Sequence, residues 1–190
     1  MSELSVRGVN EDLSLLVNSL SDSDKLIPSF VEIAKRSMVI PCFSIALSFI
    51  GVVNFYLSLM AERAISLSNF RVFFWEEGWY PVAASVVVGL LFFIMSYTNL
   101  TLYMTIPSDI RNKSLVMKHI RGLIKKTILI FISLICLVTV FTGVVPALTF
   151  AVPGITFVFL FAINIVVSVE VNRLGMGPMM EKISKLIKKI

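Results

Sequence analysis

Few side chains in this sequence could carry out chemistry, and none of them stands in a pattern that supports catalysis or metal binding. The chain has one histidine, His119, and two cysteines, Cys42 and Cys136. His119 has no metal-ligand companion at helical spacing, and the sequence contains neither a glycine-rich phosphate loop nor a serine–histidine arrangement. We therefore expect no enzyme, no cofactor and no metal site, with His119 as a surface residue and both cysteines as packing residues.

The segment 68–80 has the composition of a recognition surface instead. Six of its residues are aromatic, and an arginine and two glutamates stand among them. An aromatic belt at the membrane interface explains Trp79 and Tyr80 well. It explains the whole cluster less well, because aromatic and arginine side chains are also the usual anchors of protein interfaces. Both interpretations stay open and can coexist; the candidate partner contacts are Phe70, Arg71, Phe73, Phe74, Trp75, Glu76, Glu77 and Trp79.

Membrane-spanning helices must position these side chains. Hydrophobic residues make up 57% of the 190-residue chain and charged residues only 15%, and the mean hydropathy is +0.90. A soluble domain has about a quarter charged residues. Residues 37–60, 78–108 and 127–169 carry no Asp, Glu, Lys or Arg. A helix over 127–169 would be about 64 Å long, twice the roughly 30 Å hydrocarbon core, so this stretch must fold back on itself.

The expected fold class is therefore an all-α integral membrane protein with four transmembrane helices in two hairpins. This excludes a soluble enzyme, a secreted disulfide scaffold and a nucleic-acid-binding domain. We expect a loop at 61–80, a span that begins at Pro81, a basic connector at 105–126 and a turn at 147–149. The membrane domain is 37–169, with spans at about 37–60, 81–104, 127–146 and 150–169.

The two ends of the chain differ in charge pattern. Residues 1–36 form a polar N-terminal segment, in which Asn10 can cap a helix that has Glu11 and Asp12 in its first turn. Residues 170–190 form a basic tail with apolar residues on one helical face and lysines mostly on the other. Such a helix lies on an anionic membrane surface, although a positive flank that only sets topology is the alternative. The candidate membrane-surface residues are Lys182, Lys185, Lys188 and Lys189.

Polar residues inside the spans are uncharged. Three asparagines are the costliest in lipid, and we expect them to form hydrogen bonds between helices: Asn54, Asn99 and Asn164. Two pairs of small residues four positions apart permit close helix approach: Ser44 with Ser48, and Ser85 with Gly89. A polar pathway for transport is the alternative. Ion-coupled transporters normally place ionisable groups at depth, and no span has one at its centre.

Orientation follows from the distribution of basic residues. Fifteen of the seventeen Lys and Arg residues lie in the N-terminal segment, the 105–126 connector and the tail, and the remaining two lie in the 61–80 loop. The positive-inside rule then places both termini and the connector in the cytoplasm, with two hairpins pointing outward. We expect a multi-pass protein of the bacterial inner (plasma) membrane.

This plan resembles the inner-membrane entry-exclusion proteins of F-type conjugative plasmids, the TraS group. The resemblance is carried by chain size, the polar segment ending at Lys35-Arg36, four spans in two hairpins and the basic tail. It implies a protein that blocks redundant DNA transfer by recognising a component of the donor's mating apparatus. No single residue of the family can be matched to this sequence, because the likeness is one of architecture.

Other functions agree with the same sequence. The runner-up is an immunity protein against a pore-forming bacteriocin, and further alternatives are a small transporter or channel and a subunit of a secretion system. The expected partners are a bilayer with anionic lipids and another membrane or secretion-machinery protein, with a homo-oligomer possible and no nucleic acid.

Overall fold

The fold is known from a computed structural model, which describes residues 8–9, 11–12, 14–16, 29–60 and 65–175. Within these residues all regular structure is helical, which confirms the all-α prediction. The elements are α2 (Phe30–Leu59), α3 (Leu67–Phe73), the π-helical turn η1 (Phe74–Gly78), α4 (Trp79–Met104), α5 (Ser108–Lys113), α6 (Leu115–Phe141), the 3₁₀-helical turn η2 (Pro146–Phe150) and α7 (Ala151–Arg173).

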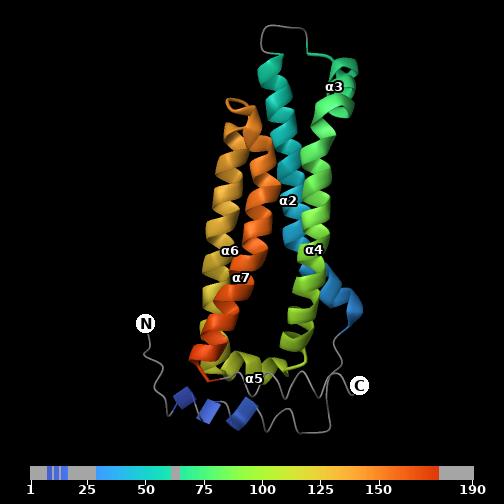
Figure 1. The fold of residues 1–190 in the computed structure, drawn as a ribbon. Coiled ribbons are helices and arrows are strands. Elements are labelled where there is room, and N and C mark those ends of the chain that lie inside the picture. Colours follow the sequence, from blue (N-terminus) through green and yellow to red (C-terminus); the bar gives the residue numbers. More distant parts are fainter. Residues whose placement is uncertain (1–7, 10, 13, 17–28, 61–64, 176–190) are drawn as a thin grey trace.

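Four long helical stretches lie side by side in an elongated bundle (Figure 1). Each of them is long and apolar enough to cross a membrane, as the sequence predicts. Helix α2 packs against α4, α6 against α7, and α4 also against α7. We call the end with α3 and η2 the aromatic end, and the end with α5 and the start of α6 the basic end.

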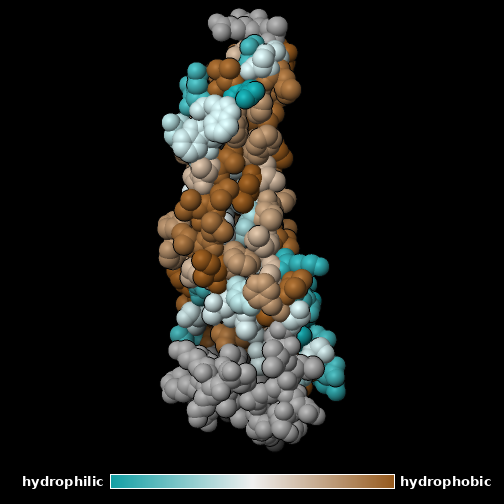
Figure 2. All heavy atoms as spheres, turned by 90° about the vertical axis from the view of Figure 1, so that its right-hand side faces the viewer, coloured by the Kyte–Doolittle hydropathy of each residue, from teal (hydrophilic) through white to brown (hydrophobic). Residues whose placement is uncertain are grey.

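The outer surface of the bundle is apolar over its middle. Figure 2 shows hydrophobic side chains in a broad band between more polar patches near the two ends. Large aliphatic side chains on all four long helices contribute to this exposed surface, among them Val39, Leu90, Leu129 and Val158. An exposed apolar surface of this extent is what a lipid environment requires, because hydrocarbon solvates such side chains and water does not.

Residues 67–80 are helical and not part of the loop that we predicted at 61–80. Helix begins at Leu67 and continues through α3, η1 and α4 to Met104. Pro81 therefore does not start the span but lies well inside this stretch. A proline lacks the backbone N–H, and its ring clashes with the carbonyl four residues earlier. The π-helical turn Phe74–Gly78 contains Glu77, which is the residue four positions before Pro81, and it widens the helix there, so the chain remains helical past the proline.

The third long helix also starts earlier than its uncharged stretch. Helix α6 begins at Leu115, and Ser114 caps it by accepting a hydrogen bond from the Met117 amide at 3.1 Å. The basic residues of the predicted connector thus occupy the first turns of a long helix, or the short helix α5 before it. At the other end of α6 the predicted turn is a 3₁₀-helical turn that begins at Pro146.

Small residues bring the helices close together. The four that the sequence singled out, Ser44, Ser48, Ser85 and Gly89, are all buried. The hydroxyls of Ser44 in α2 and Thr156 in α7 lie 2.6 Å apart. A β-carbon at Gly89 would lie 3.4 Å from the Pro41 β-carbon, which is van der Waals contact, so α2 and α4 pack closely at this small residue.

The described residues between 8 and 16 in the N-terminal segment are helical and dock on the basic end. Val9 and Leu16 are buried against Ile106, Val116 and Met117. This apolar contact ties the start of the chain to α6 and the turn before α5. The proposed cap Asn10 and the tail lysines 182, 185, 188 and 189 lie outside the described residues.

Candidate functional site

The aromatic segment has an inner face that packs on α2. Phe70, Phe73 and Phe74 stand at positions i, i+3 and i+4, which share one face of a helix. Phe73 is buried. The ring centroid of Tyr56 lies 5.1 Å from that of Phe70 and 5.4 Å from that of Phe73. The ring of Phe74 lies 6.1 Å from that of Phe49. These distances are typical of favourable aromatic pairs, so three of the eight candidate contacts hold α3 and η1 against α2.

The other five candidates form an outer face. Arg71, Trp75 and Trp79 stand at intervals of four residues and are all exposed, Trp75 at 67% and Trp79 at 39%. Glu76 and Glu77 are exposed beside them. Within the part of the chain that the structure describes, none of the three charged side chains forms an ion pair. We call these five residues the outer aromatic face; tryptophan and arginine side chains of this kind are common in protein interfaces.

The three asparagines make hydrogen bonds from one helix to another. The Asn99 amide nitrogen in α4 donates to the Asn164 side-chain oxygen in α7 at 3.0 Å, and Asn164 in turn donates to the Leu160 carbonyl at 2.7 Å. Asn54 in α2 donates to the Thr139 carbonyl in α6 at 3.2 Å. Each of the three side-chain amide nitrogens therefore donates a hydrogen bond within the protein, where lipid would offer no acceptor.

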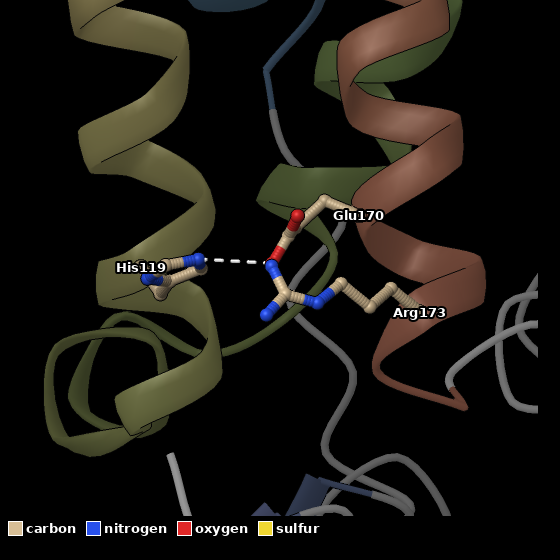
Figure 3. A network of polar contacts seen from close by, with 3 residues as sticks. All are labelled: His119, Glu170 and Arg173. Carbon is tan, nitrogen blue, oxygen red and sulfur yellow. Dashed lines mark hydrogen bonds and ion pairs between the residues drawn. The ribbon is translucent and has the colours of Figure 1, made fainter. Parts of the chain in front are cut away.

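The structure also joins His119 to a residue that sequence reasoning passed over (Figure 3). The Nε2 atom of His119 in α6 lies 2.9 Å from Oε1 of Glu170 in α7, and Arg173 Nη1 lies 3.6 Å from the same oxygen. The Glu170 residue is only 8% exposed. The expectation that His119 is an ordinary surface residue is thus incomplete, because its ring holds a buried carboxylate at the basic end.

A cavity of about 620 Å³ opens between α2, α4, α5, α6 and α7 on the side of the basic end. Aliphatic and aromatic side chains form most of its lining, and the Asn99–Asn164 pair lies in its wall. Three arginines line it as well: Arg36, Arg111 and Arg121. The sequence offered no direct signal for this cavity, since its lining residues come from helices that are distant along the chain.

Within the described residues no group of three or more His, Cys, Asp or Glu side chains could hold a metal ion. Comparison with protein-family models, curated protein sequences and solved structures finds no match to this chain. Two features therefore remain as candidate sites: the outer aromatic face at one end of the bundle and the arginine-lined cavity toward the other.

Proposed function

We propose that the protein acts by recognition and not by catalysis, and that it binds another membrane protein through the outer aromatic face. The observation that carries this proposal is Trp75, a large aromatic side chain that is 67% exposed beside Glu76 and in line with Arg71. Burial of a tryptophan in a partner typically contributes about 2 kcal/mol or more to binding. The inner face of the same segment, packed on α2, holds this side chain on a rigid helix and lowers the entropic cost of binding.

The proposed topology has two outward hairpins and both termini in the cytoplasm of a bacterial inner membrane. Support comes from the charge difference between the two ends of the bundle. The described part of the aromatic end has a single basic residue, Arg71. The basic end has many more: Lys35, Arg36, Arg111, Lys113, Lys118, Arg121, Lys125, Lys126 and Arg173. By the positive-inside rule the aromatic end then faces outward, where a partner from another cell or a toxin would arrive.

Within this class, we favour entry exclusion in conjugation, with bacteriocin immunity as the alternative. The likeness to the exclusion proteins in size, span number and charge distribution supports the first. Both functions need an exposed surface at the outer end and neither needs a catalytic group, so an experiment must separate them.

Recipient cells that produce the protein test the proposal. They are challenged with donors carrying F-type conjugative plasmids and, in parallel, with pore-forming bacteriocins. Exclusion predicts fewer transconjugants with at least one plasmid of the panel, and immunity predicts survival with at least one toxin. Trp75→Ala should abolish the effect at an unchanged membrane level of the protein. Phe157→Ala is the matched control, because Phe157 is also an exposed aromatic residue but lies on the apolar surface of α7.

A photo-reactive amino acid at position 75 makes the test direct. During challenge, cross-linking from position 75 should capture one defined protein, and cross-linking from position 129 on the apolar surface of α6 should not. Full protection by the Trp75→Ala variant, together with equal cross-linking from the two positions, would exclude the outer aromatic face as the recognition surface.

A further inference from the structure

The arginine-lined cavity has two chemically different parts. Its walls are mostly aliphatic or aromatic, with Phe92, Ile128 and Ile163 among the lining residues. Toward the basic end the lining includes Arg111 in α5 and Arg121 in α6. A volume of about 620 Å³ falls within the roughly 300–1,000 Å³ of small-molecule sites. An apolar cavity with cationic groups near one end is suited to bind an amphiphile, which has an apolar chain and a charged head group.

Tyr103 holds the two arginines close together. The Arg111 guanidinium carbon lies 4.8 Å from the centre of the Tyr103 ring, and the Arg121 guanidinium carbon lies 5.9 Å from it. Arg121 Nη2 also donates a hydrogen bond to the Tyr103 hydroxyl. Two like charges on one aromatic ring repel each other unless an anion neutralises them.

The described residues supply no such anion. Neither arginine forms an ion pair there, and the buried Nε of Arg111 has no hydrogen-bond partner. Two buried carboxylates at the basic end are engaged elsewhere: Asp12 binds the start of α6, and Glu170 binds His119 and Arg173. The exposed Asp109, in the same helix as Arg111, accepts from the Ser108 hydroxyl at 3.4 Å and forms no ion pair among the described residues. A buried N–H group without a partner is rare in folded proteins, so the charge of Arg111 is left uncompensated by the described residues.

From these contacts we infer that the cavity binds an anionic phospholipid, with the phosphate on Arg111 and Arg121 and an acyl chain along the apolar walls. A guanidinium presents a planar fork of N–H donors that matches the oxygens of a phosphate. Basic pockets between membrane helices at the cytoplasmic side are known to take anionic head groups. A free phosphate would satisfy the arginines but would leave the apolar walls without a ligand. The inference does not depend on the proposed recognition function; only the assignment of the cavity to the cytoplasmic side rests on the proposed topology.

The test uses the purified full-length protein in detergent. Dioleoyl phosphatidylglycerol, dioleoyl phosphatidylcholine and inorganic phosphate are added separately, and the thermal unfolding midpoint and native mass spectra are recorded. Phosphatidylglycerol should raise the midpoint and appear bound at one molecule per chain. Equal binding of phosphatidylcholine would contradict recognition of the anionic head group, and equal stabilisation by inorganic phosphate would show that the ligand is a free anion.

Two variants locate the site. Arg111→Gln combined with Arg121→Gln should weaken phosphatidylglycerol binding at least about tenfold, because both charge-assisted contacts are lost. Lys125→Gln combined with Lys126→Gln is the matched control, since it removes the same charge from exposed positions of α6. Val167→Phe fills the cavity without altering charge and should also weaken lipid binding. If the arginine double variant and the Val167 variant, both folded, retain the affinity of the wild type, the cavity is not the binding site.

Discussion

The carboxylate of Asp12 lies 2.6 Å from the hydroxyl of Ser114, 102 residues further along the chain, and accepts a second hydrogen bond from the Val116 amide at 3.0 Å. Ser114 is the N-terminal cap of α6, so this buried carboxylate sits at the positive end of the helix dipole. One side chain of the N-terminal segment thus completes the capping of a membrane helix and fixes the segment on the basic end.

Asp12→Ala should therefore destabilise the protein by about 1–3 kcal/mol, because two buried donors lose their acceptor. Its thermal unfolding midpoint in detergent should fall, and hydrogen exchange should accelerate at Val116 and Met117. Asp109→Ala is the control, because Asp109 is an exposed acid in the first turn of α5. Equal effects of the two changes would show that Asp12 contributes no more than general charge.

A second prediction concerns the π-helical turn at the aromatic end. A β-carbon at Gly78 would lie 2.8 Å from Cγ1 of Val52, which is closer than atoms can pack. Gly78→Ala should cost about 1–3 kcal/mol of stability as an overpacked contact. Val52→Ala removes the methyl groups of Val52, including the one that clashes. Adding Gly78→Ala to the Val52→Ala variant should therefore lower the free energy of unfolding much less than it does in the wild type. Unfolding of the two single variants and the double variant measures this coupling.

Gly122 provides the matched control, because a β-carbon there would meet nothing within 4 Å. Gly122→Ala in α6 should stabilise the helix by up to about 1 kcal/mol through its higher helix propensity. If Gly78→Ala were equally harmless, close packing of η1 on α2 would not be needed at this position.

The number of spans could be predicted from the sequence, but the helix ends could not. The uncharged stretches are long enough for four membrane-spanning helices, and the structure has four helices that are long and apolar enough to cross a membrane. Charges do not stop a helix, however. Two helices extend beyond their uncharged stretches: one includes Arg71, Glu76 and Glu77, and the other includes Lys118, Arg121 and Lys125. Their backbone hydrogen bonds continue where the charged side chains can reach water or head groups.

The sequence could predict a candidate site only where its residues lie close together along the chain. If residues 68–80 are taken as a helix, the spacing of Phe70, Phe73 and Phe74 assigns these three side chains to one face. The outer aromatic face is then formed by other positions of the same helix. The pair His119–Glu170 spans 51 residues, and Arg111 and Arg121 meet through Tyr103. Such contacts depend on how α4, α5, α6 and α7 pack, and no periodicity in one sequence encodes that packing.

A third prediction tests the contact between α6 and α7. Glu170→Ala removes a nearly buried carboxylate from His119 and should lower stability by about 1–3 kcal/mol. Arg173→Gln should change stability by less than about 1 kcal/mol, because Arg173 is 75% exposed and its ion pair at 3.6 Å is screened by water. Combining His119→Ala with Glu170→Ala measures the coupling between the two side chains. Additive losses in that double-mutant cycle would mean that the 2.9 Å contact contributes no coupling energy.

The last prediction tests the proposed topology, on which the location of the outer aromatic face depends. Cys42 and Cys136 are the only cysteines and can first be replaced by alanine, after which single cysteines are introduced at Trp75 and at Lys118. Both positions are exposed, and they lie toward opposite ends of the bundle. A membrane-impermeant maleimide applied to intact spheroplasts should label position 75 at once and position 118 only after the membrane is permeabilised. The reason is that translocation of the segments with most Lys and Arg is disfavoured, so the basic end stays inside. Labelling in the reverse order would place Trp75 in the cytoplasm, and a partner arriving from outside the cell could then not reach it.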